Sequence, residues 1–405
     1  SRMCSTMSPT ERSNAHAQAI DNNSGIAYKS FRGAEGGSEH FISVQVPHML
    51  SLEQQVSLVR ERYAAALRTL GLVPETAIFR RVFLSDAVNQ AAVVRETDLV
   101  CDTPDNPVAV SIVQQQPLPA SKVALLAYHI ESPDPLAKER LSARHVLVRK
   151  NGLRHLWSTR LCGGAHDLSI DAAGQTRNIF NDLIGTLTGQ GGRLADHCVR
   201  TWIYMKGVDV FYKDMVDSRK LVFDRHGLTR DTFYIASTGI EGACAHQYDV
   251  VSMDAYSNLD LAPGQRTFLN DFSRLCPTKD YNVTFERGTR IAYADRVHHF
   301  ISGTASIDSQ GEVLHIGDVL KQLDRAVENV DALLHSGKAQ FEDMQHLIVY
   351  LRDPADFVSV DAWFREHYPD LPVIIVQGAV CRPEWLIEIE GIAITANHEP
   401  SLPSF

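Results

Sequence analysis

A chain of 405 residues with 44% hydrophobic and 22% charged residues has the composition of a globular protein, with room for two or three domains. Its formal net charge of -10 argues against a nucleic-acid-binding protein, which needs a basic face to displace counterions from the phosphate backbone. The seven cysteines stand singly without a CxxC pair, no signal-peptide core opens the chain, and no apolar run approaches the roughly 18 residues of a membrane helix, so we expect a cytoplasmic protein with reduced thiols.

The chain begins with a polar segment, residues 1–38, that is rich in Ser, Asn and Gly and that we expect to be a flexible leader. A first structural unit, 39–133, opens on the strand phrase His40-Phe41-Ile42-Ser43. Ser51-Leu52-Glu53-Gln54 has the capping-box pattern that begins a helix, which we expect to reach about Leu70. The remaining expected elements are a strand at 77–84, a helix at about 88–97 and strands at 107–114 and 122–130.

The opening phrase returns twice, as His155-Leu156-Trp157-Ser158 and as His299-Phe300-Ile301-Ser302, and this recurrence indicates internal duplication. Before the first return, Lys150-Asn151-Gly152 is typical of a type I′ hairpin turn. We expect four further segments: a second unit at 140–260, a connecting loop at 261–290, a third unit at 291–396 and a tail at 397–405.

Each unit is expected to have the order β-α-β-α-β-β, an α+β pattern in which helices cover one face of a sheet. In the second unit we expect helices at about 175–188 and 211–226, with strands at 199–205, 233–237 and 248–254. In the third we expect helices at 316–336 and 355–367, with strands at 345–351, at 372–380 and from Trp385 onward. Three such units predict an intramolecular pseudo-trimer with ligand clefts between neighbouring units. Because its interfaces are then satisfied within one chain, we expect a monomer or weak dimer.

The last expected strand carries acids at an unusual place. Apolar and acidic residues alternate from Trp385, so Glu388 and Glu390 share one face while Ile387 and Ile389 share the other. Cys381 and Arg382 lie on the loop that enters this strand, which brings a thiol and a cation near the acids. The alternative is a solvated edge strand with a structural cysteine.

The third unit is similar to the RidA/YjgF superfamily over roughly residues 295–396, and the first two units are similar more faintly. The phrases that carry this resemblance are Phe300-Ile301-Ser302-Gly303-Thr304-Ala305, the helix at 318–329, Val349-Tyr350-Leu351-Arg352-Asp353 and Ile387-Glu388-Ile389-Glu390. The resemblance implies chorismate-mutase-like α+β units that form trimers with clefts between protomers. A triplicated chain corresponds to such a trimer made covalent.

From about Asn178 to its end, the chain also resembles the chorismatases, which remove pyruvate from chorismate. The matching phrases are Arg200-Thr201-Trp202-Ile203-Tyr204, Tyr212 with Arg219, Thr238-Gly239-Ile240, Phe285-Glu286-Arg287-Gly288-Thr289, Phe300-Ile301-Ser302-Gly303-Thr304-Ala305, and Cys381-Arg382 with Leu386-Ile387-Glu388-Ile389-Glu390-Gly391. The combination of Gly303 and Cys381 resembles the branch that forms 3-hydroxybenzoate rather than a dihydrodiol. A Tyr-Gly-Pro-Arg phrase of that family is absent before Arg287, which leaves the substrate open.

The resemblance implies a general acid and a thiol with separate roles. Glu388 would protonate the enol ether, since a carboxyl group on a half-buried strand can have its pKa raised by desolvation. Glu390 is the alternative acid, or a residue that reaches solvent. Cys381 would assist the later ring-opening step, with Arg382 favouring its thiolate; a buried inert cysteine is the alternative.

The carboxylates of the substrate need cations, and the candidates are Arg219, Arg287 and Arg382, each of which could instead be structural. Tyr204 would orient the substrate hydroxyl or ring, or would pack in the core. Gly303 would leave space close to the backbone, or would relieve a strand bulge.

Two other functions stay open: an imine or enamine deaminase, and a non-catalytic binder of small carboxylates. The deaminases carry a carboxylate-binding arginine early in the strand after the second helix. In this chain the corresponding position is at about Val373 in the third unit and at about Ala109 in the first, and the second unit has no arginine near 232–235. We expect no cofactor and no metal, because the seventeen histidines include no HExxH motif, and Gly163-Gly164 and Gly191-Gly192 lack a phosphate-binding pattern.

Overall fold

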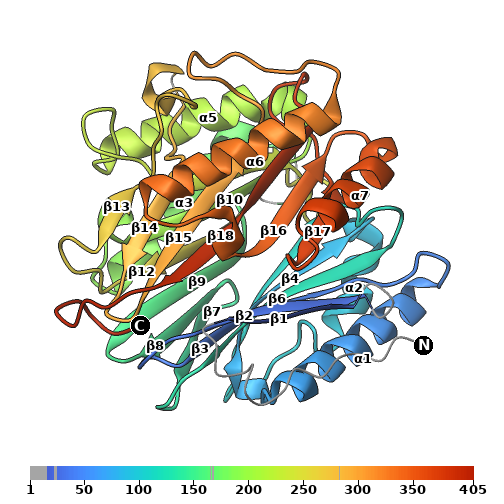
Figure 1. Ribbon diagram of the computed structural model, residues 1–405, viewed down its shortest axis with the longest axis vertical. Coiled ribbons are helices and arrows are strands. Elements are labelled where there is room, and N and C mark those ends of the chain that lie inside the picture. The colour runs from blue at the N-terminus through green and yellow to red at the C-terminus, as the bar shows by residue number, and fades with distance from the viewer. Residues whose placement is uncertain (1–15, 22–24, 165, 167, 282) are drawn as a thin grey trace.

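The computed structural model describes residues 16–21, 25–164, 166, 168–281 and 283–405, which fold into three six-stranded sheets with helices on their outer faces (Figure 1). The strand orders are β1-β2-β3-β6-β4-β5, β7-β8-β9-β12-β10-β11 and β13-β14-β15-β18-β16-β17. The three orders are the same when each sheet is counted from its own first strand, and in each sheet only the last pair is parallel. The sheets therefore define units 1, 2 and 3 of a pseudo-trimer, and the predicted α+β class is confirmed.

Unit 1 confirms the expected helix after the capping box. The Ser51 hydroxyl accepts a hydrogen bond from the backbone N–H of Gln54, and the Gln54 side chain accepts one from the backbone N–H of Ser51. Gly71 ends the helix in the left-handed region at φ 69°. The elements of unit 1 are β1 (His16–Asp21), β2 (Ile26–Arg32), β3 (Ser38–Val44), α1 (Leu52–Leu70), η2 (Pro74–Thr76), β4 (Ala77–Leu84), α2 (Ala87–Arg95), β5 (Ala109–Gln114) and β6 (Val123–Glu131).

Unit 2 contains the predicted hairpin, in which Asn151 and Gly152 both have positive φ, 52° and 76°, as a type I′ turn requires. The turn joins β8 to β9 in antiparallel register. The elements of unit 2 are β7 (Ala137–Ser142), β8 (His145–Lys150), β9 (Leu153–Cys162), α3 (Ala172–Gly189), α4 (Leu194–His197), β10 (Cys198–Met205), α5 (Val208–Arg225), β11 (Ala236–Glu241) and β12 (Val251–Asn258).

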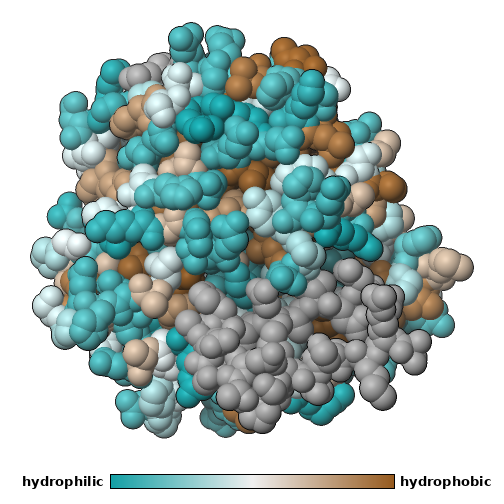
Figure 2. Space-filling view, viewed as in Figure 1, coloured by the Kyte–Doolittle hydropathy of each residue, from teal (hydrophilic) through white to brown (hydrophobic). Residues whose placement is uncertain are grey.

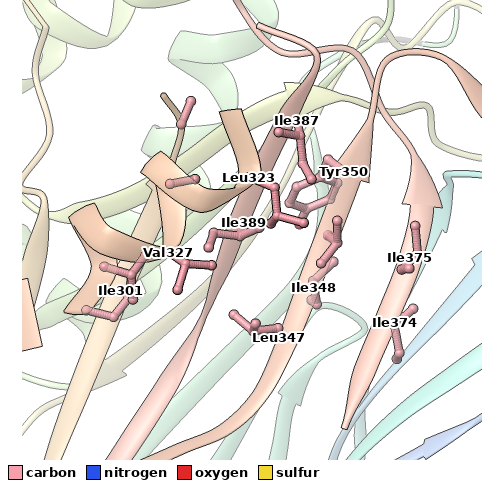
Figure 3. Packing of buried hydrophobic residues seen from close by; sticks show 14 of the residues in the cluster. Ile301, Leu323, Val327, Leu347, Ile348, Tyr350, Ile374, Ile375, Ile387 and Ile389 are labelled. Atoms are coloured by element: carbon pink, nitrogen blue, oxygen red, sulfur yellow. The ribbon is translucent and has the colours of Figure 1, made fainter. Parts of the chain in front are cut away.

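Unit 3 buries the aliphatic face of its last strand against a helix. Figure 3 shows Leu323 and Val327 of α6 facing Ile389 of β18, all of them buried. The elements of unit 3 are β13 (Arg266–Phe268), η3 (Thr278–Tyr281), β14 (Gly288–Ala292), β15 (Arg296–Thr304), α6 (Val319–Ser336), η4 (Phe341–Asp343), β16 (Met344–Leu351), η5 (Pro354–Asp356), α7 (Phe357–His367), β17 (Val373–Gln377) and β18 (Ile387–Ala396). The acidic face of β18 is consequently turned inward, away from α6.

Two expected segments have more structure than the sequence indicated. The expected leader, 1–38, contains β1 and β2, and β2 pairs with β3 along its whole length, from Ile26 opposite Val44 to Arg32 opposite Ser38. The expected connecting loop, 261–290, contains β13, η3 and the start of β14. These strands lie at or next to the edge of their sheets, are short or polar and lack a clear alternation, so only their pairing reveals them. Residues 1–15 and 22–24 of the expected leader lie outside the described residues.

Equivalent positions in the three units follow from a bulge that recurs in β4, β10 and β16, just before Phe79, Arg200 and His346. Counting from these bulges, Phe41, Trp157 and Phe300 occupy the same place. The recurring phrase is therefore shifted by one residue in unit 2, where Leu156, not His155, corresponds to His40 in unit 1.

The inner faces of the sheets meet along an axis filled with aromatic rings. The ring of Tyr128 lies 4.8 Å from Phe41 and 5.7 Å from Trp157, and the ring of Tyr256 lies 4.8 Å from Trp157 and 5.7 Å from Phe300. This row of stacked and tilted rings crosses all three units, so it ties them into one core.

Next to the rings, the corresponding positions Glu39, His155 and His298 form a mixed polar layer. Glu39 accepts a hydrogen bond from Arg296 (3.0 Å) and lies 2.7 Å from His298 Nε2. These opposing charges and hydrogen bonds outweigh burial and hold the pKa of Glu39 well below its usual value.

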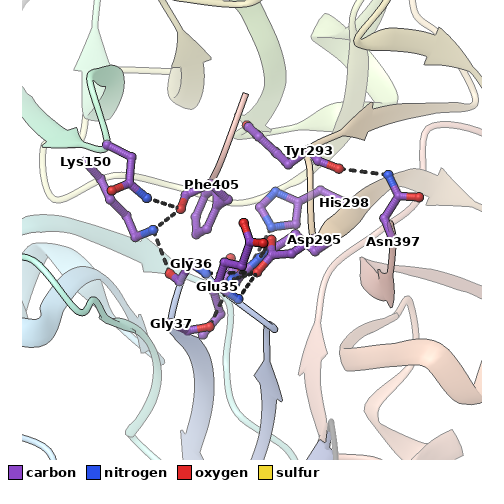
Figure 4. A network of polar contacts seen from close by, with 12 residues as sticks. Glu35, Gly36, Gly37, Lys150, Tyr293, Asp295, His298, Asn397 and Phe405 are labelled. Atoms are coloured by element: carbon purple, nitrogen blue, oxygen red, sulfur yellow. Dashed lines mark hydrogen bonds and ion pairs between the residues drawn. The ribbon is translucent and has the colours of Figure 1, made fainter. Parts of the chain in front are cut away.

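The expected tail, 397–405, packs against this end of the axis. Lys150 lies beside Phe405 (Figure 4), and Asn151 Nδ2 donates a hydrogen bond to Phe405 O over 2.6 Å. Asp295 accepts from Gly36 N (2.9 Å), which links units 3 and 1 in the same network. No helix in the described part of the chain is long and apolar enough to cross a membrane.

Candidate active site

A cavity of about 500 Å³ lies where unit 2 meets unit 3. Its walls come from α5 and β11 of unit 2 and from the segment before β14, β15, the segment before β18 and the start of β18 in unit 3. Six of the seven predicted site residues line it, namely Arg219, Arg287, Gly303, Cys381, Arg382 and Glu388.

Glu388 enters the cavity from the inward face of β18, opposite Tyr350 of β16. Burial and the negative charge of Glu390 raise the pKa of Glu388 to about 8, although Arg200 and Arg287 pull it in the other direction. No hydrogen bond to this carboxyl group comes from the residues that the structure describes. Glu388 is thus mainly a neutral acid at pH 7, with a proton that it can give to a bound molecule.

Gly303 provides the space for that acid. It lies at a register shift of β15 between Ile301 and Thr304, and a Cβ atom on residue 303 would overlap Glu388 Oε1. Its backbone N–H donates to Thr238 Oγ1 of β11 over 2.9 Å. Both sequence interpretations of this glycine therefore hold, because the bulge and the open space occur together.

Glu390 lies behind Glu388 and does not line the cavity. Its carboxylate accepts hydrogen bonds from Arg200 Nη2 (2.7 Å), from Trp202 Nε1 (2.8 Å) and from the Tyr350 hydroxyl, and the residue is 2% exposed. The alternative in which Glu390 reaches solvent is wrong, because its partners in units 2 and 3 enclose it. Its negative charge adds to burial in raising the pKa of Glu388.

Three guanidinium groups face the cavity without a carboxylate partner in the described part of the chain. Arg219 donates through Nε to Thr284 Oγ1 (2.9 Å), while its buried Nη2 has no partner. Arg287 donates through Nη2 to Cys276 O (3.3 Å), and its buried Nε has none.

The third of these groups, Arg382, lies with its guanidinium carbon 4.7 Å from the centre of the Trp385 ring and donates to Gly311 O over 2.8 Å. The cavity therefore holds three unneutralised positive charges beside a neutral acid. Such a site favours a ligand with more than one negative charge.

Cys381 reaches the cavity next to Tyr212, with which its thiol forms a hydrogen bond. Burial and the charge of Glu388 raise the pKa of Cys381 to about 12, and the Tyr212 hydrogen bond and Arg382 only partly oppose this. Arg382 does favour the thiolate, as expected, but burial outweighs it, so the group at neutral pH is a thiol.

Tyr204 does not line the cavity. Its ring packs in the core of unit 3 and beside the Arg81 guanidinium, 5.6 Å away, which agrees with the alternative interpretation of core packing. The sequence assigned no role to Thr238, whose hydroxyl accepts hydrogen bonds from both Arg200 (2.7 Å) and Gly303. Its place in the phrase that resembles the chorismatases was the only signal that pointed to it.

A family model described as Endoribonuclease L-PSP matches residues 289–395. A RutC family protein of Pyrococcus abyssi is 33% identical over 97 residues, which span 23% of this chain and 76% of that protein. The chain belongs to the RidA/YjgF (L-PSP) family. The matched region is unit 3, and the sheets of units 1 and 2 repeat its strand order.

Two enzymes of this family match the chain over a similar length. The 3-aminoacrylate deaminase RutC of Acinetobacter baylyi is 28% identical over 96 residues, 23% of this chain and 76% of that protein. The 3-hydroxybenzoate synthase of Streptomyces hygroscopicus is 31% identical over 105 residues, 24% of this chain and 31% of that protein.

The crystal structure of a chorismatase superposes with a TM-score of 0.59 at 20% sequence identity, covering 79% of this chain and 93% of that one. This likeness establishes a shared fold. The RidA-family relatives thus include enzymes, and the arrangement of the units is that of a chorismatase.

Proposed function

We propose that the chain is a chorismatase-like enzyme that cleaves the enol ether of chorismate, or of a closely similar dicarboxylate, in the cleft between units 2 and 3. The observation that carries this proposal is the pairing of a neutral Glu388 with three guanidinium groups that have no ion-pair partner among the described residues, all in one cavity of about 500 Å³. A dicarboxylate with an acid-sensitive ether requires both features at once.

The reaction would begin with binding of the substrate carboxylates by Arg219, Arg287 and Arg382. Glu388 then transfers its proton to the enol-ether methylene carbon, which leaves an oxocarbenium ion on the side chain and a carboxylate on Glu388. The carbon–oxygen bond of this side chain breaks after capture by an oxygen nucleophile, and pyruvate leaves. Formation of a hydroxybenzoate consumes no water overall, whereas formation of a dihydrodiol consumes one molecule.

Cys381 would act as a thiol on the intermediate rather than on the substrate. Its hydrogen bond with Tyr212 places it at the wall of the cavity next to Glu388. A neutral thiol can donate a proton or a hydrogen bond to an opening epoxide-like ring, and it could direct the product toward 3-hydroxybenzoate in this way.

The test is incubation of the purified chain with chorismate, followed by measurement of pyruvate. Glu388→Gln keeps the shape but removes the transferable proton, so turnover should fall by at least about a hundredfold. The matched control is Glu384→Gln, the same change at an exposed position four residues earlier, which should leave turnover unchanged. Full activity in Glu388→Gln, or no pyruvate from the unaltered chain, would contradict the proposal.

The deaminase alternative lacks a feature that favours it. The strands after the second helices, β5, β11 and β17, begin at Ala109, Ala236 and Val373, and none of these residues can clamp a carboxylate. A non-catalytic binder of small carboxylates would need the arginines but not a raised pKa at Glu388. Tight chorismate binding without turnover would support that alternative.

We also propose that the chain is a monomer or at most a weak dimer, because its three unit interfaces are already formed within one chain. The face seen in Figure 2 is mostly hydrophilic, with hydrophobic residues scattered among the polar ones. Sedimentation equilibrium should give a mass near 45.0 kDa. A stable threefold assembly of whole chains would contradict this.

A further inference from the structure

A second cleft lies between units 1 and 2, in the place that corresponds to the active cleft between units 2 and 3. It has a volume of about 300 Å³, and β5 adjoins β9 there as β11 adjoins β15 in the active cleft. Its wall on the side of unit 2 contains five side chains that commonly bind metals, namely Cys162, His166, Cys244, His246 and Asp249.

These side chains already lie close to the spacing of metal ligands. The sulfur atoms of Cys162 and Cys244 and a carboxylate oxygen of Asp249 all lie within 4.8 Å of one another, and ring nitrogens of His166 and His246 lie equally close to Asp249. Zinc binds sulfur at about 2.3 Å and nitrogen at about 2.0 Å, so ligand atoms around a tetrahedral ion stand roughly 3.3–3.8 Å apart. The two groups share Asp249, so one ion held by both cysteines and Asp249 gains its fourth ligand when one histidine side chain turns toward the sulfur atoms.

Asp249 gives an independent indication that a ligand is missing from this cluster. The residue is 2% exposed, and its Oδ2 lies 3.0 Å from His166 Nδ1, but its buried Oδ1 has no hydrogen-bond partner among the described residues, which exclude 165 and 167. Burial of a carboxylate oxygen without a hydrogen-bond partner is unfavourable, because the oxygen loses its hydration and no protein group replaces it. A cation at this point would supply the missing interaction.

The local backbone holds Asp249 in this place. Gln175 of α3 accepts a hydrogen bond from Val250 N (2.8 Å) and donates one to Tyr248 O (3.2 Å), so it fixes the chain on both sides of Asp249. Directly after Cys162, a Cβ atom on Gly163 would overlap Gln175 O, and one on Gly164 would overlap Asp249 Oδ1. The glycine pair thus lets the segment that carries Cys162 approach the aspartate.

We propose that the cleft between units 1 and 2 binds one zinc-class divalent ion through the thiolates of Cys162 and Cys244 and the carboxylate of Asp249, with an imidazole of His166 or His246 as the fourth ligand. Thiolate, imidazole and carboxylate together are the ligand set that zinc prefers. The ion fastens the end of β9 to the loop between β11 and β12.

The charges around the cleft suit this assignment. Two thiolates and one carboxylate exceed the charge of a divalent ion by one negative charge, and Arg95, Arg144 and Arg160 line the same cleft and offset it. The sequence predicted no metal site because it contains no compact metal-binding motif such as HExxH. These ligands come instead from two short segments, 162–166 and 244–249, that meet only in the folded chain.

The test measures the metal in the full-length chain, purified through a tag without histidines and dialysed against metal-free buffer. We expect about one equivalent of zinc per chain, and Cys244→Ser and Asp249→Asn should bind zinc at least about tenfold more weakly, since even loss of an outer partner of a ligand has an effect of that size. Cys101→Ser, a change at an exposed cysteine outside the cluster, is the matched control and should keep the full equivalent.

Cobalt provides a second readout that does not depend on enzyme activity. Cobalt(II) in place of zinc should give the charge-transfer absorption of thiolate ligands in the unaltered chain and in Cys101→Ser, and Cys162→Ser should weaken it. His166→Ala and His246→Ala, tested separately, identify the fourth ligand by the larger loss of affinity. Circular dichroism confirms that each variant is folded.

Three outcomes would overturn the assignment. One is an unaltered chain that takes up neither zinc nor cobalt. Another is undiminished zinc binding in folded Cys244→Ser and Asp249→Asn, which would place the metal elsewhere. The third is a disulfide between Cys162 and Cys244 that persists under reducing conditions and is found by mass spectrometry, because a disulfide removes both thiolates.

Discussion

The clefts between units 2 and 3 and between units 1 and 2 are built by corresponding strands, yet they differ at two decisive positions. Thr304 pairs with Ile389 after the bulge in unit 3, as Leu161 pairs with Met253 in unit 2. Counted from these pairs, Glu388 corresponds to Ser252 and Gly303 corresponds to Arg160. Where one cleft has an acid and open space, the other has a hydroxyl group and a large cation.

The two clefts also share a buried acid at one corresponding position, although the arginine that pairs with it stands two residues further along the strand in unit 1 than in unit 2. Glu390 binds Arg200 over 2.7 Å, and the corresponding Asp254 binds Arg81 over 3.0 Å, with all four side chains buried. The buried ion pair therefore belongs to the scaffold of each cleft, and it does not by itself make a cleft catalytic. The chemistry of a cleft therefore depends on the side chains that lie between this ion pair and the cavity.

The largest expected effect concerns this shared scaffold. Arg200→Met and Arg81→Met each leave a buried carboxylate without its partner, so each should lower the free energy of unfolding by about 3–5 kcal/mol in urea denaturation. Arg365→Met, which removes an exposed pair with Asp361, should lower it by less than about 1 kcal/mol. A loss as small as the control at both buried sites would refute the idea of a common scaffold.

Gly303→Ala should separate the clefts by function. Its methyl group must displace the Glu388 carboxyl, and because a misplacement of about 1 Å can reduce a rate a hundredfold, turnover of chorismate should fall by about that factor. Arg160→Ala at the corresponding position of the other cleft should leave turnover unchanged. Equal effects of the two changes, measured as pyruvate release, would mean that the clefts are not functionally distinct.

The pH dependence should also be a property of one cleft. The proton donor is the neutral form of Glu388, whose pKa is raised to about 8, so turnover should be nearly level below pH 7 and fall about tenfold between pH 7 and pH 9. Cys244→Ser, in the other cleft, should show the same profile when pyruvate is measured after subtraction of the enzyme-free rate. Turnover that rises through this range would show that Glu388 acts as a base instead.

The smallest expected effect on rate belongs to the thiol. Cys381→Ala should change pyruvate release by no more than a few-fold, because proton transfer from Glu388 comes first. The organic product, separated by chromatography, should shift from hydroxybenzoate toward a dihydrodiol. A loss of pyruvate release as large as in Glu388→Gln would place the thiol in the first step.

Short-range patterns in the sequence predicted much of the cleft between units 2 and 3. Alternation along the last strand placed Glu388 and Glu390 on one face, and the resemblance to chorismatases named the arginines that line the cavity. The same resemblance named Tyr204, which packs in the core in agreement with its alternative interpretation, because a matching phrase does not show which side of a strand faces the cavity. The unusual pKa of Cys381 depends on burial that a loop sequence does not reveal.

Long-range features were beyond such patterns. β13 and β2 are recognisable only through their partners in the sheet, since neither has an alternating run of its own. The cysteines and histidines of the cleft between units 1 and 2 are about eighty residues apart in two groups. Their proximity is a consequence of strand pairing, which brings the end of β9 next to the start of β12.

The mixed layer of Glu39, His155 and His298 at the axis has a consequence for how such a protein can diverge. In an assembly of three identical subunits, a glutamate at this position would occur three times, and three carboxylates would repel one another at the centre. A single chain specifies each copy of the position separately, so one acid can face two imidazoles there. A single chain is not bound by threefold symmetry, so the side chains of each cleft, and with them its chemistry, can differ from those of the other clefts.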